Sequence, residues 1–298
     1  MIQKIDFSTI TTNCNLKFGV SRCSSLEEEI SDIYSLKKEN VLVSNGTITL
    51  LKKLFDQIRI RDVTLITPDY FEFAKLCTHK TVIARNKDYS VPTLNTHTDA
   101  ILISNPNNPS GTVHELEQLV RVTRKNDQLL IVDEAYLEFV NENQTIINLV
   151  RDNPHLVVLR TFSKFYSLIK DKVGYVIAHP DIIDGLDVPE ANVNAKKEAQ
   201  LLLNSTNKDY VRADVNKRKV LLINLLSKIA DEISCSSVNF LLARNTTYPL
   251  KAVMAEINVD VLDLDNTLGL EHRGYVRVAV GSYEQINDFS RRLERWNL

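Results

Sequence analysis

Four short runs of this chain are almost entirely apolar and rich in β-branched residues, and polar residues follow each of them. They occupy residues 63–66, 100–104, 129–132 and 156–159. Helical patterns lie between several of these runs, most clearly at residues 114–125. Apolar strands that alternate with helices predict a mainly parallel sheet covered by helices on both faces, and therefore an α/β fold. Ligands of such sheets bind at the carboxyl ends of the strands, so the residues after each run are the candidates for function.

A smaller α+β lobe is predicted in the last third of the chain. The whole chain has 298 residues, which is long enough for two domains. The patterns after residue 180 indicate a short helix at 181–186, a loop at 189–194, a long helical segment at 195–229, and strands at 238–243 and 275–280. Ser25 and the acidic residues after it indicate a capped helix near the N-terminus. We therefore predict an N-terminal arm and helix that join the small lobe (1–39), a large ligand-binding domain (40–190), and a linking helix with the small domain (191–298).

Composition and charge give no reason to expect several classes of partner. The formal net charge of -2 does not favour nucleic acid or an acidic membrane surface. No run reaches membrane-spanning length, and the first residues lack the apolar core of a signal peptide. The spacing of the four cysteines fits neither a zinc site nor a redox motif; they are Cys14, Cys23, Cys77 and Cys235. We therefore expect reduced thiols and no bound metal in a cytoplasmic protein.

Lys164 stands just after the last of the four runs, within the segment 157–175. The run breaks at Thr161-Phe162-Ser163-Lys164, and a second apolar run follows at residues 174–178. Burial disfavours the charged form of an amine. A neutral amine in this setting can form a Schiff base with an aldehyde cofactor. A solvated lysine on a surface loop is the alternative, because most lysines are exposed.

The other three runs also lead into side chains that can serve a ligand. Tyr70 follows the first run within TPDY, Asn108 follows the second within NPNNPSG, and Asp133 and Tyr136 follow the third within DEAY. A carboxylate directly after a buried strand needs a partner, because an unpaired buried charge is costly. Taken singly, each motif also has a structural explanation: a core tyrosine, a rigid turn and a helix cap.

A further strand, at residues 41–43, leads through Asn45-Gly46-Thr47 into a helical pattern. A strand, a short glycine-containing turn and a helix together direct unpaired backbone N–H groups at an anion. A plain strand-to-helix connection is the alternative. With Ser163, these three residues are the candidates for binding a phosphate group.

Together these residues suit pyridoxal 5'-phosphate (PLP). Lys164 would bind its aldehyde, and Asp133 would keep its ring nitrogen protonated. Asn108 and Tyr136 would form hydrogen bonds with its phenolic oxygen, and Tyr70 would stack on its ring.

The motifs NPNNPSG, DEAY and RTFSK, in this order, resemble those of the class I/II aminotransferases of PLP fold type I. The likeness is greatest to histidinol-phosphate aminotransferases and threonine-phosphate decarboxylases. It covers residues 41–175 and resumes at 275–281. The resemblance implies that Arg277 binds a substrate carboxylate through its planar guanidinium. A surface ion pair on a strand is the alternative for this arginine. The resemblance also implies a homodimer.

Three segments depart from the family pattern. Lys172 stands where the family has the arginine of GLRxGY, so it would offer the cofactor phosphate a point charge without the planar fork. The N-terminal segment is short, with Asn15 as a candidate substrate ligand and Phe18 near the stretch that usually carries a tyrosine for the neighbouring subunit's site. Relatives that bind a phosphorylated substrate have an arginine where this chain has Leu262-Asp263-Leu264, which removes a charge-assisted contact to a substrate phosphate.

The leading hypothesis is a PLP-dependent aminotransferase that moves an amino group from an amino acid to a keto or aldehyde acceptor, with glutamate as the expected donor. Lys164 would be the general base that moves the substrate proton. One alternative is a PLP-dependent decarboxylase of a phospho-amino acid. Another is a degraded, non-catalytic paralogue that keeps the fold for binding or assembly.

Overall fold

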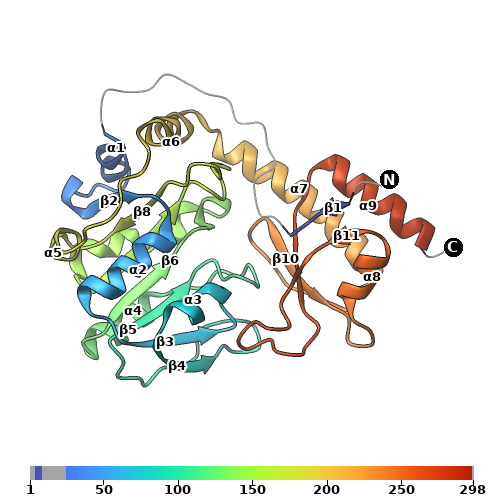
Figure 1. Ribbon diagram of the computed structural model, residues 1–298, viewed down its shortest axis with the longest axis horizontal. Helices are drawn as coiled ribbons and strands as arrows, with labels where there is room; N and C mark the ends of the chain where they lie inside the picture. Colours follow the sequence, from blue (N-terminus) through green and yellow to red (C-terminus); the bar gives the residue numbers. More distant parts are fainter. Residues whose placement is uncertain (1–3, 9–24, 297–298) are drawn as a thin grey trace.

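Two β-sheets of different size organise the chain (Figure 1). The computed structural model describes residues 4–8 and 25–296. A seven-stranded sheet lies on the left of Figure 1 and a four-stranded sheet on the right. Within the described residues, no helix is both long enough and apolar enough to cross a membrane.

The large sheet has the strand order β2-β8-β7-β6-β5-β3-β4. Neighbouring strands pair in parallel except at β8, which is antiparallel to both β2 and β7. The strands are β2 (Val41–Ser44), β3 (Asp62–Thr67), β4 (His79–Ala84), β5 (Ala100–Ser104), β6 (Leu129–Asp133), β7 (Leu156–Thr161) and β8 (Gly174–Ile177). The prediction of a mainly parallel sheet is therefore confirmed, and each predicted strand of this sheet is present.

Strand β4 was not predicted. It is the edge strand beside β3, and most of its side chains are exposed. An edge strand that faces solvent needs no apolar run, so its sequence carries no burial pattern from which to recognise it.

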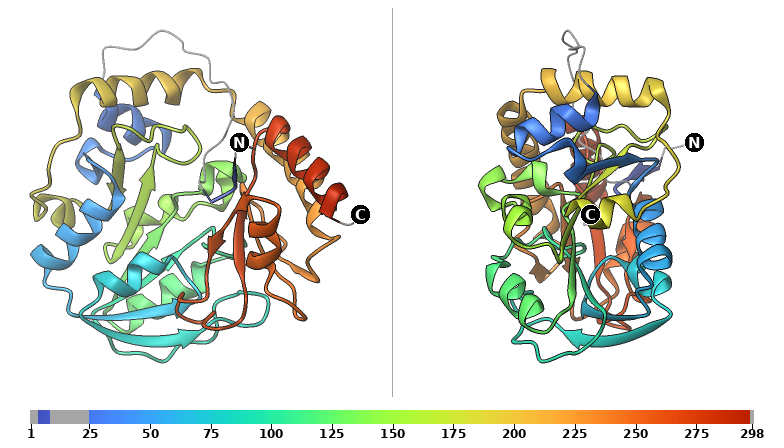
Figure 2. Two further views of the ribbon diagram at one scale, coloured as in Figure 1. Left: turned by 45° about the vertical axis from the view of Figure 1, so that its right-hand side comes forward. Right: turned by 90° about the vertical axis from the view of Figure 1, so that its left-hand side faces the viewer.

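Both faces of the large sheet are buried. Ile101, Ile103 and Leu130 pack in one apolar cluster with helix α4 (Glu117–Lys125), whereas Leu102 and Ile131 pack in another with helix α2 (Thr47–Ile58). In the right-hand view of Figure 2, α2 (blue) and α4 (green) lie on opposite sides of the strands. This arrangement requires strands that are apolar on both faces.

Three further α-helices are α1 (Leu26–Ile33), α3 (Phe71–Leu76) and α5 (Pro180–Asp184). The predicted cap of α1 is confirmed: the Ser25 side chain accepts from the Glu28 N–H, and the Glu28 carboxylate accepts from the Ser25 N–H. The helix predicted from residue 114 begins later, at Glu117. Asn105 holds both the N–H and the carbonyl of His114 with its side-chain amide, so residue 114 is held by that side chain outside the helix.

The long helical segment predicted at 195–229 is two helices, α6 (Val193–Ser205) and α7 (Lys208–Leu226). Asn207 separates them, and its side chain caps α7 by accepting from the Tyr210 N–H. A capping side chain competes with the helix backbone for hydrogen bonds, which explains the break.

The small sheet is antiparallel, with the order β12-β13-β10-β9. Its elements are β9 (Glu232–Ile233), β10 (Phe240–Arg244), β12 (Leu262–Asp263) and β13 (Val276–Ala279), with helices α8 (Leu250–Glu256) and α9 (Tyr283–Trp296). Strand β1 (Ile5–Asp6) pairs with β11 (Val259–Asp260), and the adjacent Phe7 ring packs against Phe289 of α9 at 5.6 Å. The predicted α+β character of this lobe is confirmed. The domain boundaries at residues 40 and 191 stay a prediction.

Gly174 lets β8 approach the start of α2 more closely than any other residue could. A Cβ added there would lie 2.6 Å from the backbone nitrogen of Thr47 and 2.8 Å from the carbonyl carbon of Gly46. Real Cβ atoms do not come so close to backbone atoms, so this contact fixes where α2 begins.

We predict that Gly174→Ala lowers the free energy of unfolding by about 1–3 kcal/mol, because backbone must move to admit the methyl group. Gly185→Ala is the matched control, since a Cβ there would meet its nearest atom at an ordinary 3.5 Å. Urea denaturation measures both. Equal stability of the two variants would contradict the close approach of β8 and α2.

Candidate active site

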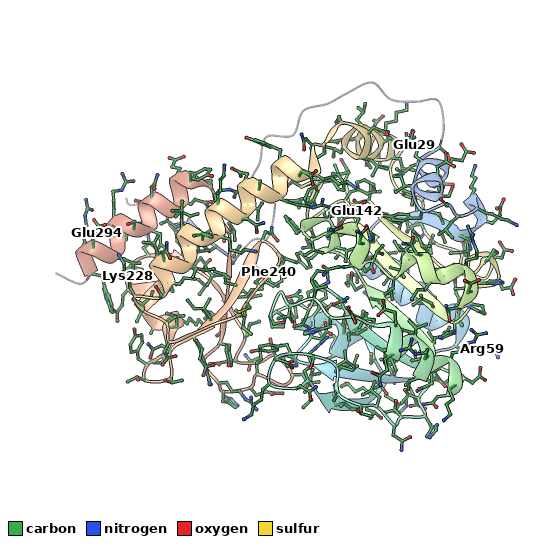
Figure 3. All side chains as sticks on the ribbon, turned by 180° about the vertical axis from the view of Figure 1, so that it is seen from behind. Glu29, Arg59, Glu142, Lys228, Phe240 and Glu294 are labelled. Atoms are coloured by element: carbon green, nitrogen blue, oxygen red, sulfur yellow. The ribbon has the colours of Figure 1, made fainter. Side chains whose placement is uncertain are left out.

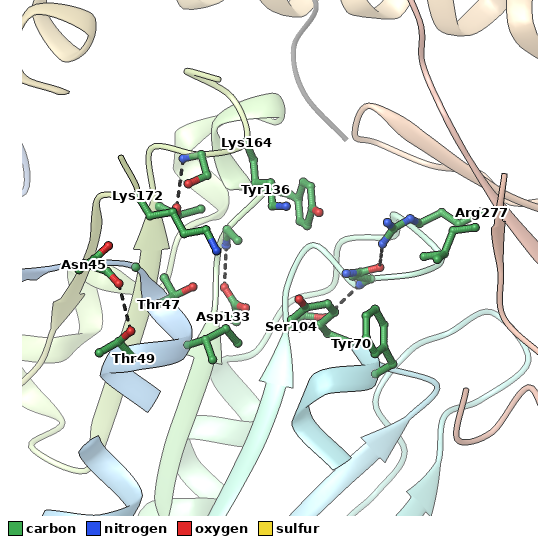
Figure 4. Close-up of a pocket in the computed structure, with 18 residues that line it drawn as sticks. Asn45, Thr47, Thr49, Tyr70, Ser104, Asp133, Tyr136, Lys164, Lys172 and Arg277 are labelled. Carbon is green, nitrogen blue, oxygen red and sulfur yellow. Dashed lines mark hydrogen bonds between the residues drawn. The ribbon is translucent and has the colours of Figure 1, made fainter. Parts of the chain in front are cut away.

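A cavity of about 550 Å³ lies where the carboxyl ends of the parallel strands face the small sheet (Figure 4). The large sheet supplies residues that follow β2, β3, β5, β6 and β7, and the small sheet supplies residues of β12 and β13. Phe240 of β10 lies where the two lobes meet (Figure 3), with its ring 5.0 Å from the ring of Tyr136. Both lobes therefore build the walls of one cavity.

The cavity collects every predicted site residue that the structure describes. These residues are Asn45, Gly46, Thr47, Tyr70, Asn108, Asp133, Tyr136, Ser163, Lys164, Lys172 and Arg277. Asn15, with Phe18, lies outside the described residues. Within residues 4–8 and 25–296, no group of three or more His, Cys, Asp or Glu side chains could hold a metal ion.

The N-terminus of α2 opens into this cavity. Gly46 precedes the helix with a φ of 88°, a left-handed conformation that a residue with a Cβ adopts only with strain. The first N–H groups of a helix have no partner within it and carry partial positive charge. The Lys172 side chain packs over this turn, because a Cβ on Gly46 would lie 3.5 Å from the Lys172 Cβ. This corner of the cavity can therefore hold a phosphate group.

Asp133 ends β6 at the floor of the cavity. Its carboxylate accepts a hydrogen bond from the N–H of Ala135 at 3.0 Å. Burial raises the pKa of the Asp133 carboxyl to about 7, and the nearby Asp69 charge adds to that rise. The Ala135 N–H and the charge of Lys164 act in the opposite direction. A second cation placed against this carboxylate would favour its charged form.

The Lys164 amine lies beside the Tyr136 ring in the cavity (Figure 4). The Lys164 nitrogen lies 5.7 Å from the centre of the Tyr136 ring. Lys164 is half-buried, whereas Lys170, six residues later, is exposed. Lys164 therefore lines the cavity, as the Schiff-base hypothesis requires, and is less exposed than a fully solvated loop lysine.

Arg277 enters the cavity from β13, and no carboxylate of residues 4–8 or 25–296 forms an ion pair with it. Its Nη1 donates to Asn108 Oδ1 at 2.7 Å, and its guanidinium carbon lies 5.3 Å from the centre of the Phe240 ring. The buried Nε of Arg277 has no hydrogen-bond partner within the described residues. Burial lowers the pKa of Arg277. The alternative of a surface ion pair is wrong, because this arginine is 8% exposed.

A buried ion pair between Arg85 and Asp69 supports Tyr70, the residue predicted to stack on a cofactor ring. Arg85 donates to the Asp69 carboxylate at 2.9 Å, and the two side chains are 1% and 3% exposed. The same carboxylate accepts the N–H of Tyr70 at 2.7 Å and both the N–H and the hydroxyl of Ser104. The Ser104 hydroxyl in turn accepts the N–H of Asn108 at 3.0 Å. One buried carboxylate thus fixes the ends of both β3 and β5.

A second buried network connects the strand ends that carry Asp133 and Lys164. Arg160 of β7 donates to Glu134 through Nε at 3.0 Å and Nη2 at 2.8 Å. Its Nη1 reaches Glu138 at 3.1 Å and the Tyr34 hydroxyl at 2.8 Å. This network was not predicted. A charged residue within an apolar run does indicate a buried ion pair, because a buried charge requires a partner.

The sequence patterns also missed several residues that line the cavity: Ile48, Thr49, Phe71, Ser104, Ala135, Thr161 and Leu262. Those of the large lobe lie at a strand end or within five residues after it, in the same segments that carry the predicted residues. Leu262 comes from a different sheet, and the family resemblance pointed to its segment only as one that lacks an arginine.

The chain is similar in sequence to known proteins. A family model described as aminotransferase class I and II matches residues 15–256. Histidinol-phosphate aminotransferase 3 of Mesorhizobium japonicum is 31% identical over 296 residues, which cover 91% of this chain and 78% of that protein.

Two solved structures share the fold. The histidinol-phosphate aminotransferase from Clostridium acetobutylicum has a TM-score of 0.85 at 19% identity, covering 99% of this chain and 100% of that one. The L-threonine-O-3-phosphate decarboxylase from Porphyromonas gingivalis has a TM-score of 0.77 at 20% identity, covering 98% and 99%.

We predict that Arg85→Met lowers the free energy of unfolding by about 3–5 kcal/mol, because it leaves the buried Asp69 carboxylate without its cation. Lys75→Met is the matched control. Lys75 pairs with Glu72 at 2.7 Å, but its side chain is 64% exposed, so its loss costs less than about 1 kcal/mol. Urea denaturation at neutral pH measures both. A small effect of Arg85→Met would show that the pair does not hold the strand ends.

The raised pKa of Asp133 predicts a pH dependence of stability in the cofactor-free protein. The unfolded chain loses this proton near pH 4 and the folded protein near pH 7, so folding keeps a proton between these values. Rising pH therefore removes stability, by up to about 1.4 kcal/mol per pH unit from this group. Asp133→Asn should accordingly gain stability relative to the unaltered protein as pH rises from 5 to 7. A stability difference that does not vary with pH would contradict the prediction.

Proposed function

The chain belongs to the aminotransferase class I and II family, and from this membership we propose that it moves an amino group from an amino acid, with glutamate as donor, to a keto or aldehyde acceptor. The cofactor of this family is pyridoxal 5'-phosphate. One observation carries the proposal: the Lys164 amine, the buried Asp133 carboxylate and the N-terminus of α2 all line one cavity.

The residues present suit this cofactor. A cavity of about 550 Å³ is in the range of small-molecule sites. The N–H groups at the start of α2, with Ser163 and Lys172, form a cationic corner for a phosphate group. Asp133 at the floor of the cavity suits a protonated ring nitrogen, since its burial otherwise disfavours the carboxylate. Tyr70 lines the same cavity and offers a flat face to the ring.

When bound, pyridoxal 5'-phosphate supplies an aldehyde for condensation with an amine and a protonated ring that accepts the electron pair from a bond broken at the substrate Cα. Asp133 keeps the proton on the ring nitrogen. Tyr136 and Asn108 orient the phenolic oxygen. Because Asn108 accepts from Arg277 through Oδ1, its amide N–H groups are left to donate to that oxygen.

Lys164 would be the residue that holds the cofactor's aldehyde. Its amine, directed into the cavity beside Tyr136, takes the proton from the substrate Cα. Arg277 binds the substrate carboxylate, because its buried Nε has no hydrogen-bond partner in the described part of the chain and a carboxylate oxygen supplies one. Lys172 balances phosphate charge at a single point, without the two parallel hydrogen bonds that an arginine would give.

We further propose that the protein works in the cytoplasm as a homodimer. Cys77, which is buried, and Cys235, which is exposed, are both free thiols, as expected in a reducing compartment. Size-exclusion chromatography with light scattering measures the assembly directly.

We predict that Lys164→Ala abolishes covalent attachment of the cofactor. In the unaltered protein, borohydride reduction should link pyridoxal phosphate to the peptide that contains Lys164, as seen by mass spectrometry. Conversion of the cofactor to its amine form by glutamate should fall by about 10²–10⁴-fold or more in the variant, because the base at Cα is gone.

Lys170→Ala is the matched control, an exposed lysine of the same segment, and it should leave both measurements unchanged. Attachment at another lysine would contradict the assignment of Lys164. Release of carbon dioxide from a phospho-amino acid, with no amine form of the cofactor produced by any amino acid, would favour the decarboxylase instead.

A further inference from the structure

A second cavity, of about 430 Å³, adjoins the first. Phe71 of α3 and Leu262 of β12 line both cavities, so they stand between them. Ala74 and Leu268 add apolar surface to the second cavity. Phe71, Ala74, Leu262 and Leu268 are only partly buried, so they leave apolar surface open to a ligand.

Leu262 lies directly beside the arginine assigned to the substrate carboxylate. In the antiparallel pairing of β12 and β13, Leu262 is opposite Arg277. Side chains at opposed positions project from the same face of a sheet and touch. The carboxylate of the next residue, Asp263, forms an ion pair with the Lys251 amine at 2.5 Å. A substrate whose carboxylate reaches Arg277 therefore places its side chain next to a leucine.

The charges around the two cavities do not favour a phosphorylated substrate side chain. Among the described residues, three cations line the first cavity: Lys164, Lys172 and Arg277. In the proposed function, Lys164 binds the aldehyde, Lys172 binds the cofactor phosphate and Arg277 binds the substrate. The second cavity has two lysines, Lys75 and Lys80, against two carboxylates, Asp263 and Glu271, so these side chains carry no net charge. One guanidinium balances a carboxylate, whereas a phosphate ester carries about -1.5 to -2 at pH 7.

We propose that Phe71 and Leu262 form a subsite for an apolar substrate side chain, so that the enzyme acts on unphosphorylated amino acids with large apolar side chains and on their keto acids. This inference rests on the proposed function, because it takes Arg277 as the carboxylate ligand. The side chain leaves the Cα beside Arg277, passes between Phe71 and Leu262, and ends in the second cavity.

Binding of unreactive carboxylates to the PLP-loaded protein tests the subsite without any turnover. Calorimetry should show that 3-phenylpropanoate binds at least about tenfold more tightly than acetate or propyl phosphate, since one methylene in an apolar pocket gives roughly tenfold or more. Tighter binding of propyl phosphate than of 3-phenylpropanoate would overturn the proposal.

Leu262→Arg should reverse this order. It should lose about tenfold in affinity for 3-phenylpropanoate and gain about tenfold for propyl phosphate, because it adds a second cation beside Arg277. β12 is an edge strand and Leu262 is partly exposed, so the fold has room for the longer side chain. Leu262→Met, which keeps an apolar side chain of similar volume, is the control and should retain the original order. An unchanged order in Leu262→Arg would remove Leu262 from the subsite.

Turnover separates this inference from the proposed function. Phenylalanine and leucine should convert the bound cofactor to its amine form faster than alanine or phosphoserine does. If 3-phenylpropanoate binds best but no amino acid reacts, the subsite stands and the aminotransferase assignment falls. If amino acids react but phosphoserine reacts faster than phenylalanine and leucine, the assignment stands and the apolar subsite falls.

Discussion

The burial of the Asp133 carboxylate is the constraint on which the rest of the site depends. Removing a carboxylate from water disfavours its charge, and here burial raises the pKa to about 7 despite the Ala135 N–H and the charge of Lys164. A protonated ring nitrogen placed against this group would stabilise the carboxylate and would itself stay protonated. In the proposed function, the contact that would offset the cost of burial would also give the cofactor its capacity to accept electrons.

The surrounding structure holds the other groups at fixed positions around that carboxylate. The Asp69–Arg85 pair holds the ends of β3 and β5, and the Glu134–Arg160 pair connects the ends of β6 and β7. Both pairs are buried, so removing one partner would leave an uncompensated charge. Gly174 adds the close contact of β8 with the start of α2. The site is therefore built from strand ends that cannot move independently.

Much of this arrangement could be predicted from the sequence because a parallel sheet gathers its strand ends at one edge. That rule predicts that Tyr70, Asn108, Asp133 and Lys164 lie close together. It could not find β4, whose exposed side chains carry no burial pattern, or the late start of α4, which depends on the contact of Asn105 with residue 114. It also missed Leu262, because register between β12 and β13 decides what lies beside Arg277.

The protonation state of the cofactor's ring nitrogen tests the central claim most directly. Nitrogen-15 NMR of the protein loaded with ring-labelled pyridoxal phosphate reports that state as a chemical shift. The pairing with Asp133 predicts a protonated nitrogen at pH 8 in the unaltered protein and an unprotonated one in Asp133→Asn, in which cofactor binding is confirmed by absorbance. An unprotonated nitrogen in the unaltered protein, or the same chemical shift in both proteins, would contradict the account.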